Sequence, residues 1–191
     1  TNEKPALETA IGMSYAGKRS IVCMKHVGLN VAADPFMNLS ITGTNGGLVI
    51  LIADDPSMHS SQNEQDSRFF AKFAMIPCFE PSNQQEAYDM TYKAFDFSEK
   101  HRVPVMLRVT TRLAHSRAGV TRKEVRLQNE ISLHPNPKQF ILLPGNARVF
   151  YKEALAKQPK LNEESENSSF NQYFDGKDKS LGIIASGIAL N

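Results

Sequence analysis

Three short segments of this chain carry residue types that could do chemistry. Glu3 lies at the start of a predicted helix, nine positions before Gly12. Residues 24–30 (MKHVGLN) and 59–68 (HSSQNEQDSR) each follow a strand-like run, and α/β folds bind ligands in loops at the carboxyl ends of parallel strands. Each segment also has a simpler explanation, as a helix-dipole residue, an ordinary turn and a solvated loop respectively.

The elements that must position these segments alternate between helix and strand patterns, as in a parallel α/β sheet. Residues 48–53 (LVILIA) are apolar at every position, which predicts a strand buried on both faces. Ser82 and Gln85 form a capping-box pattern. We therefore expect an α/β fold with helices on both faces of a parallel sheet. Helices are predicted over 4–16, 30–42, 61–73 and 82–100, and strands over 20–24, 48–53, 76–79 and 105–109.

The character of the chain changes after Arg112. Apolar runs become rare up to residue 180, which predicts an extended connector with one helix near 146–157. Residues 181–185 (LGIIA) then open a new strand pattern with no crossover behind it, and no strand precedes the first helix. We expect a piece of a longer polypeptide. Its predicted parts are a domain over 1–115 without its N-terminal strand, a connector over 116–180, and the first strand of a following domain in 181–191.

Composition excludes several classes of protein. The formal charge of +2 and the absence of a Lys/Arg stripe argue against nucleic-acid binding. No apolar run approaches the roughly 20 residues of a membrane span, so we expect a cytoplasmic protein. Cys23 and Cys78 lie in apolar runs and are predicted to be buried, inert thiols rather than a disulfide. Two cysteines cannot hold an iron–sulfur cluster by themselves.

Several segments together resemble the α subunit of indolepyruvate:ferredoxin oxidoreductase, a thiamine-diphosphate-dependent 2-oxoacid:ferredoxin oxidoreductase. The resemblance runs from about Asn2 to His115, and the ADDP-x-MHSSQNEQDSR pattern within it is long and idiosyncratic. The segments are EKPALETAIGMSYAGKRS, MKHVGLNVAADPFMNL, GGLVILIADDPSMHSSQNEQDSRFFAKFAMIP and PSNQQEAYDM.

The resemblance implies the pyrimidine-binding domain of a thiamine enzyme. In that domain a Glu at the start of the first helix, nine residues before a helix glycine, hydrogen-bonds the aminopyrimidine ring and activates the cofactor. Glu3 and Gly12 match this spacing, whereas Glu8 does not. Glu3 is therefore the predicted catalytic and cofactor-binding carboxyl, a role that needs a positioned acid–base group.

The resemblance also places the loop after the first strand against the cofactor. Lys25, His26, Gly28 and Asn30 are the predicted cofactor-binding residues there. Lys25 and His26 depart from the small-residue pattern of related enzymes. His26 is predicted to be catalytic as a proton shuttle, or to contact the substrate carboxylate; a structural, hydrogen-bonded histidine is the open alternative.

Residues 59–68 correspond by resemblance to a loop and helix that border the active site. Gln65 and Arg68 are the predicted substrate-binding residues, since arginine can pair a carboxylate bidentately. An i,i+4 salt bridge between Arg68 and Glu64 is the alternative, and we favour it slightly.

Some family motifs do not occur in these residues. The GDG…N motif that holds Mg²⁺ and the CxxCxxCxxxCP motifs that hold 4Fe–4S clusters are lacking, and residues 174–178 (FDGKD) predict only a turn. We expect half a thiamine diphosphate site, with Mg²⁺ and the clusters in the full-length protein, and no activity for the chain alone. Implied partners are a 2-oxo acid, CoA, ferredoxin, a β subunit and a second copy in a dimer. A noncatalytic α/β ligand-binding or interaction module is the alternative, although GxGxxG and Walker A sequences are lacking.

Overall fold

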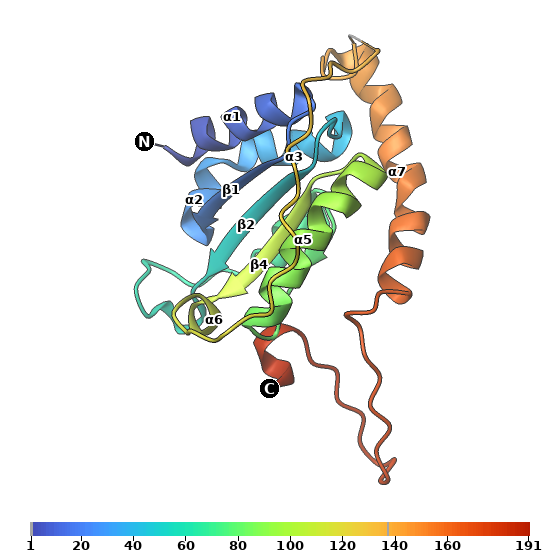
Figure 1. The fold of residues 1–191 in the computed structure, drawn as a ribbon. Coiled ribbons are helices and arrows are strands. Elements are labelled where there is room, and N and C mark those ends of the chain that lie inside the picture. The colour runs from blue at the N-terminus through green and yellow to red at the C-terminus, as the bar shows by residue number, and fades with distance from the viewer. Residues whose placement is uncertain (1, 137) are drawn as a thin grey trace.

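The computed structural model describes residues 2–136 and 138–191, and its centre is a four-stranded sheet (Figure 1). Every pair of neighbouring strands runs parallel. The predicted α/β fold with a parallel sheet is therefore confirmed. The strands, in the spatial order β1-β2-β4-β3, are β1 (Ser20–Lys25), β2 (Leu48–Asp54), β4 (Val105–Thr110) and β3 (Cys78–Phe79).

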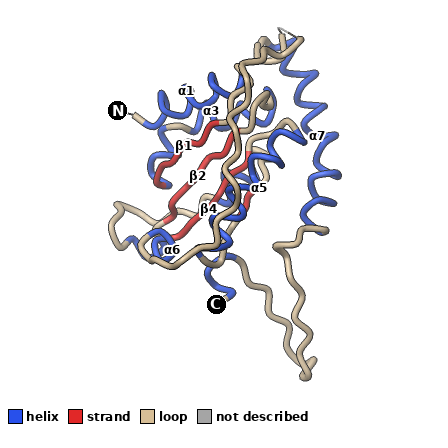
Figure 2. Tube along the Cα trace, viewed as in Figure 1, coloured by secondary structure: helices blue, strands red, loops and turns tan. Residues whose placement is uncertain are grey.

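Helices cover both faces of the sheet (Figures 1 and 2). On one face α1 and α2 pack on β1 and β2, with α3 beside them; on the other face α5 packs on β2 and β4. The last long helix, α7, packs against α3. The helices are α1 (Glu3–Tyr15), α2 (His26–Val31), α3 (Ala33–Thr42), α4 (Arg68–Phe73), α5 (Gln84–His101), α6 (Thr111–Ala114) and α7 (Pro144–Glu166), with 3-10 turns at Pro56–Met58 and Gly187–Leu190.

The core forms two apolar layers because alternate side chains of β2 point to opposite faces of the sheet. Ile50 and Ile52 pack in the layer beneath α1, α2 and α3, whereas Val49 packs with Met90 and Ala94 of α5. All three β2 side chains are completely buried. The prediction that LVILIA is a strand buried on both faces is confirmed.

The strand register brings the carboxyl ends of three strands to one edge of the sheet. Lys25, the last residue of β1, pairs with Ala53 of β2, and Asp54 of β2 pairs with Thr110 of β4. Polar residues that follow the strands are therefore neighbours in space although they are far apart in sequence. We refer to this edge as the carboxyl edge.

The helix that follows β3 begins one residue later than the predicted capping box. Asn83, not Ser82, is the N-cap: its side chain accepts a hydrogen bond from the Glu86 amide at 2.9 Å. The Glu86 carboxylate reaches back to the Ser82 amide at 2.8 Å, so Gln85 plays no part. Asparagine caps a helix as well as serine does, and a glutamate three residues later completes the arrangement.

The prediction of one helix over 61–73 is wrong for its first half, because the helix begins only at Arg68. Residues 60–67 form a loop whose serines hydrogen-bond to Asp54 and Asp55. Such side-chain hydrogen bonds compete with helix formation. The prediction of a loop after β1 is wrong as well. There α2 begins at His26, directly after the strand, and is separated by Ala32 from α3.

Two predictions about the second half of the chain also need correction. The helix predicted near 146–157 runs from Pro144 to Glu166 and continues through Pro159. No strand forms over 181–185, where Leu181 and Ile184 are 74% and 103% exposed. A strand requires a neighbour that pairs with its backbone groups, and this segment has none within the described residues.

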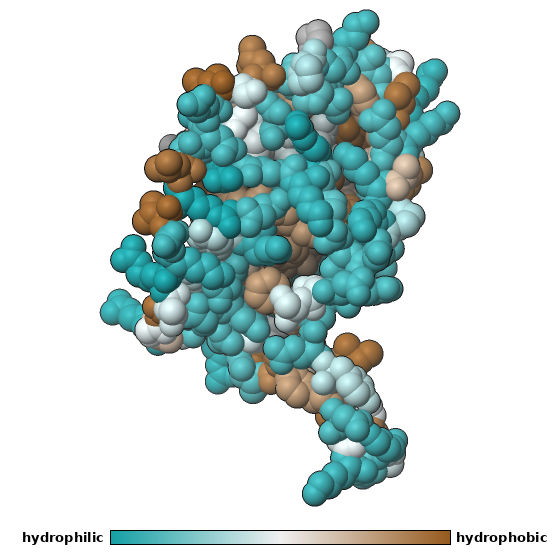
Figure 3. Space-filling view, turned by 45° about the vertical axis from the view of Figure 1, so that its right-hand side comes forward, coloured by the Kyte–Doolittle hydropathy of each residue, from teal (hydrophilic) through white to brown (hydrophobic). Residues whose placement is uncertain are grey.

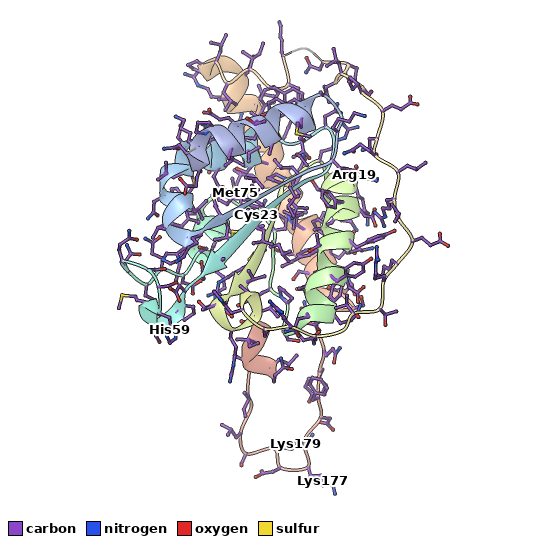
Figure 4. The ribbon with its side chains drawn as sticks, turned by 60° about the vertical axis from the view of Figure 1, so that its left-hand side comes forward. Arg19, Cys23, His59, Met75, Lys177 and Lys179 are labelled. Carbon is purple, nitrogen blue, oxygen red and sulfur yellow. The ribbon has the colours of Figure 1, made fainter. Side chains whose placement is uncertain are left out.

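The connector is better anchored than the extended pattern suggests. Residues 117–132 cross α5 towards the end of α1 (Figure 2). The Lys123 amide donates to the Tyr88 hydroxyl of α5 at 2.9 Å, and the Ser132 amide donates to the carbonyl of Ala16 at 2.9 Å. Residues 167–186 instead make a long excursion from the body, with Lys177 and Lys179 at its tip (Figure 4).

The face of the molecule seen in Figure 3 is mainly hydrophilic, with scattered apolar side chains. Cys23 of β1 is exposed, so the prediction that both thiols are buried is wrong for this residue. Cys78 is half-buried; burial is the main cause that raises the pKa of its thiol to about 12. Within residues 2–136 and 138–191, every helix is too short or too polar to cross a membrane.

Truncation of the central strand tests the core. Ile50→Ala removes a side chain that is 0% exposed, and we expect the free energy of unfolding to fall by about 2–5 kcal/mol. Urea denaturation of this chain measures the change. The control is Ile184→Ala, at a side chain that is 103% exposed, which we expect to change stability by no more than about 0.5 kcal/mol. Equal effects of the two variants would contradict the assigned core.

Candidate functional site

The candidate site lies at the carboxyl edge of the sheet. Lys25 and His26 stand at the end of β1, Asp54 and Asp55 at the end of β2, and Thr111 directly after β4. Figure 4, in which His59 marks the loop after β2, shows this loop at the end to which the strand arrows point. The edge therefore gathers several ionisable groups where α/β folds bind ligands.

Glu3 and Gly28 meet at one end of this region. Glu3 is the first residue of α1 and is half-buried, while Gly28 is buried in α2. A Cβ atom added to Gly28 would lie 2.6 Å from Glu3 Cγ and 3.0 Å from its Oε1. The glutamate side chain therefore fills the space left by the absent Gly28 side chain. The sequence predicted both residues, and the fold brings them into contact.

His26 is completely buried at the start of α2. Its Nε2 lies 3.0 Å from the carbonyl oxygen of Asn63, which can only accept a hydrogen bond, so Nε2 carries the proton. Its Nδ1 is buried and has no hydrogen-bond partner among the described residues. Buried polar atoms nearly always have a partner. The His26 ring thus both fastens the loop after β2 and presents one unsatisfied nitrogen.

Of the other predicted cofactor residues, Lys25 contacts the loop after β2. Its Nζ donates to the carbonyl oxygen of Ser60 at 3.0 Å and lies 3.9 Å from the Asp55 carboxylate. Asn30 is exposed near the end of α2, and its side chain takes part in none of the hydrogen bonds described for this edge. The fold therefore joins Lys25 to the site but not Asn30.

Asp55 is the acceptor that holds the start of the loop. Its carboxylate accepts hydrogen bonds from the Thr111 hydroxyl at 2.6 Å, the Ser60 amide at 2.8 Å and the Ser61 hydroxyl at 2.7 Å. These hydrogen bonds, that of Thr111 foremost, hold the pKa of Asp55 well below its usual range. In the sequence, Asp55 stood out only as part of the ADDP-x-MHSSQNEQDSR pattern, with no role assigned to it.

A buried ionic network lies beside Asp55 and was missed by sequence analysis. Asp54 is 1% exposed and accepts hydrogen bonds from Arg108 Nε of β4 at 2.6 Å and from the Ser67 amide at 3.0 Å. Arg108 also hydrogen-bonds Glu80, which follows β3. Arg108 lies within the apolar strand pattern VMLRV, where a single charge indicates a paired partner, since unpaired buried charges are very costly. That charge was the available indication.

Arg68 joins this network in a way that corrects the favoured salt bridge. Its Nη2 lies 2.7 Å from Asp66 Oδ2, its Nη1 lies 3.6 Å from Glu80 Oε2, and it makes no salt bridge with Glu64. Glu64 instead accepts a hydrogen bond from the Ser57 amide at 3.0 Å. The i,i+4 geometry requires one continuous helix, and α4 begins only at Arg68. The hydrogen bond to Asp66 is the main cause that raises the pKa of Arg68.

Gln65, the other predicted substrate residue, is half-buried in the same loop. Its Nε2 donates to the side-chain oxygen of Asn63 at 2.9 Å. Because the carbonyl of Asn63 is also the partner of His26, Gln65 and His26 stabilise the same turn of the loop.

A cavity of about 810 Å³ lies elsewhere. It follows the β3 edge between α5, α7 and the C-terminal segment, and Phe79, Phe97 and Leu161 contribute to its wall. Glu80 also lines this cavity, whereas Glu3, His26 and Gly28 do not. Among the residues that the structure describes, no group of three or more His, Cys, Asp or Glu side chains could hold a metal ion.

Comparison with known proteins assigns the chain to a family. The model of the thiamine diphosphate-binding domain of pyruvate flavodoxin/ferredoxin oxidoreductases matches residues 1–169, and the chain belongs to this family. The resemblance drawn from the sequence is confirmed. The described residues fit the pyrimidine half of thiamine diphosphate: the glutamate side chain lies in the space above Gly28, and the buried Nδ1 of His26 lacks a partner.

Three curated relatives are similar over nearly the whole chain. Each carries the name indolepyruvate oxidoreductase subunit IorA. The protein of Methanothermobacter marburgensis is 47% identical over 192 residues, covering 100% of this chain and 31% of the relative. Those of Pyrococcus abyssi and Thermococcus kodakarensis are 49% and 46% identical, each over 99% of this chain and 30% of the relative. The chain thus spans about a third of the length of these relatives.

The hydrogen bonds to Asp55 predict a particular loss of stability in acid. A carboxylate whose folded pKa is depressed stabilises the fold above its unfolded pKa, near ~4. This stabilisation is lost as the pH falls below ~4 towards the depressed folded pKa. We expect Asp55→Asn to make the free energy of unfolding less dependent on pH than in the wild type below about pH 4.5. Chemical denaturation between pH 6 and pH 3 measures this, and parallel curves for the two proteins would contradict it.

Proposed function

We propose that this chain supplies the aminopyrimidine half of a thiamine diphosphate site in an enzyme that oxidatively decarboxylates 2-oxo acids. The observation that carries the proposal is the contact between Glu3 and Gly28, in which a carboxyl group at a helix start lies against a position without a side chain. The family assignment supports the choice of cofactor. Thiamine diphosphate, when bound, supplies the electron sink that allows the carboxylate of a 2-oxo acid to leave as CO₂.

Glu3 is the proposed catalytic residue. Its carboxyl group hydrogen-bonds a nitrogen of the aminopyrimidine ring and exchanges a proton with it, as a positioned general acid–base. Gly28 lets the Glu3 carboxyl lie where it would hold the ring, because a Cβ atom at residue 28 would lie 2.6 Å from Glu3 Cγ. Gly28 therefore contributes to cofactor binding through the room that it leaves for the Glu3 side chain.

His26, Lys25 and Asn30 line the cofactor side of the same proposal. The unsatisfied Nδ1 of His26 accepts a hydrogen bond or a proton from the cofactor or the substrate, while its Nε2 stays bonded to Asn63. Lys25 acts through the loop that it holds at Ser60. Asn30 is the weakest member of the set, because no contact ties it to the others.

Arg68 and Gln65 are the proposed substrate residues. The Arg68 side chain is 46% exposed and carries five N–H donors, of which a carboxylate can take two. Asp66 and Glu80 fix this guanidinium at the carboxyl edge. Gln65 supports the loop that precedes it.

The names of the relatives, indolepyruvate oxidoreductase subunits, support the choice of substrate in the complete reaction. We propose that an arylpyruvate and CoA yield CO₂ and an acyl-CoA, while two electrons pass through 4Fe–4S clusters to ferredoxin. Mg²⁺, the clusters and the diphosphate half of the site belong to other parts of a longer protein, which works with a β subunit as a dimer in the cytoplasm. The chain alone is catalytically silent.

Replacing the carboxyl group of Glu3 tests the central step. In the full-length protein with its partner subunit, under anaerobic conditions, we expect Glu3→Gln to lower indolepyruvate-dependent, CoA-dependent reduction of an artificial electron acceptor by roughly 10²-fold. The control is Glu8→Gln, at an exposed residue on the same helix, which retains activity. Full activity in Glu3→Gln would move the catalytic carboxyl elsewhere, and no activity of the wild type with any 2-oxo acid would leave only the fold.

Filling the space at Gly28 is a second test. Gly28→Ala would place a methyl group 2.6 Å from Glu3 Cγ, so the carboxyl must move away from the cofactor. Because hydrogen bonds to charged groups are worth about 1.5–3 kcal/mol, we expect thiamine diphosphate to bind roughly 10- to 100-fold more weakly in the full-length protein. Calorimetric titration measures this. The control is Gly12→Ala on α1, where an added Cβ has no atom within 4 Å; it should leave the affinity for thiamine diphosphate unchanged. Equal affinities in the two variants would refute the proposed role of Gly28.

A further inference from the structure

A segment near the end of the chain contacts the ionic network at the carboxyl edge. Residues 186–191 return to the body after the long excursion (Figure 1). Arg68 Nη1 donates a hydrogen bond to the Ser186 hydroxyl at 3.0 Å, across 118 positions of sequence. Asn191 Nδ2 donates to the carbonyl oxygen of Ser82 at 2.6 Å. The segment is thus attached at both of its ends.

Gly187 is required for this attachment. It is buried although the residues before Ser186 are exposed, and its φ of +55° lies in the left-handed region. A Cβ atom there would lie 2.7 Å from Glu80 Cγ and 2.9 Å from its Oε1. The backbone of Gly187 therefore packs directly on the side chain that bridges Arg108 and Arg68.

The hydrogen bonds of Arg68 show what the segment contributes. Asp66 takes Nε and one N–H of Nη2, with distances of 2.9 and 2.7 Å. Ser186 takes one N–H of Nη1. Nη1 also lies 3.6 Å from Glu80 Oε2. A guanidinium has five N–H groups, so among the described residues only the second N–H of Nη2 has no acceptor. A free N–H on a planar group whose rotation is fixed suits one oxygen of a carboxylate.

We propose that Ser186 and Gly187 position Arg68 for the carboxylate of the 2-oxo acid. With Asp66 as its only partner, the guanidinium of Arg68 would be held along one edge and could still rotate about that edge. The Ser186 hydroxyl fixes the opposite nitrogen, while Gly187 holds Glu80 against it. Substrate affinity at the carboxyl edge therefore depends on a segment that is more than a hundred residues away in sequence. The inference rests on the proposed substrate role of Arg68.

Removal of the hydroxyl tests this in the full-length protein with its partner subunit. We expect Ser186→Ala to raise the KM for indolepyruvate roughly 3- to 10-fold, less than the loss of a direct hydrogen bond, because Ser186 acts only through Arg68. The kcat and the affinity for thiamine diphosphate should change less than about two-fold. Ser186→Thr keeps the hydroxyl and should retain the low KM. A KM that is unchanged in Ser186→Ala would overturn the proposal.

A pair of glycine variants supplies a matched comparison. Gly187→Ala introduces the clash with Glu80 and should raise the same KM. Gly182→Ala, in the exposed stretch before Ser186 and with no atom within 4 Å of the added Cβ, should not. Thermal unfolding of both variants checks that each is folded. If Gly187→Ala does not fold, the Ser186 variants decide the question by themselves.

The substitution Arg68→Gln separates this inference from the proposed function. If Arg68→Gln leaves the KM for the 2-oxo acid unchanged, Arg68 is not the substrate residue, and the inference fails with that role. If Arg68→Gln raises the KM but Ser186→Ala does not, only the positioning role fails. If both raise it, the double variant should be no worse than Arg68→Gln, because Ser186 acts through Arg68. Additive effects in that double-mutant cycle would overturn the positioning role.

Discussion

The buried contact between Asp54 and Arg108 is the interaction on which the carboxyl edge depends. Both side chains are less than a tenth exposed, and they come from neighbouring strands of the central sheet. Removing either partner would leave a charge in the interior at a cost of several kcal/mol. Because Asp54 also binds Ser67, and Arg108 also binds Glu80, this one pair joins both central strands, the loop after β2 and the end of β3.

The two halves of the candidate site use different physical means. At α1 and α2 the site depends on a missing side chain. Because residue 28 is glycine, the carboxyl group of Glu3 can lie against α2. At the ends of β2, β3 and β4 it is built from charge, with carboxylates and guanidiniums held by one another. The loop after β2 joins the halves, because Asn63 bonds to His26 and Ser67 bonds to Asp54.

Much of the fold could be predicted from sequence, because hydrophobic periodicity reports burial directly. Residues 48–53 are the clearest case, and the parallel sheet followed from them and their neighbours. The start of α4 could not be predicted. Residues 60–67 form a loop rather than a helix because they hydrogen-bond to Asp54 and Asp55 at the end of β2. Hydrophobic periodicity depends only on the residues of the segment itself. The hydrogen bonds to Asp54 and Asp55 depend on where the end of β2 lies in the folded chain.

The site divides in the same way. Glu3, His26 and Gly28 could be singled out because a family resemblance raised three weak patterns together. No pattern identified Glu80 as the partner of Arg108, since ion pairs across a sheet leave no periodic trace in sequence. Asp66 was missed as the partner of Arg68 because residues two apart do not face each other in the helix that was predicted there. The single arginine in VMLRV was the only local indication of a buried partner.

The backbone of the loop after β2 has a thermodynamic consequence. Ser57 and Met58 both have positive φ, at 66° and 54°, although neither is glycine. Each such residue costs of the order of 1–3 kcal/mol, and the hydrogen bonds made by Glu64, Asp55 and His26 offset that cost when the chain folds. The loop is thereby preorganised. A ligand that arrives at this edge meets a surface whose conformational entropy has already been lost, and more of its contact energy is retained as affinity.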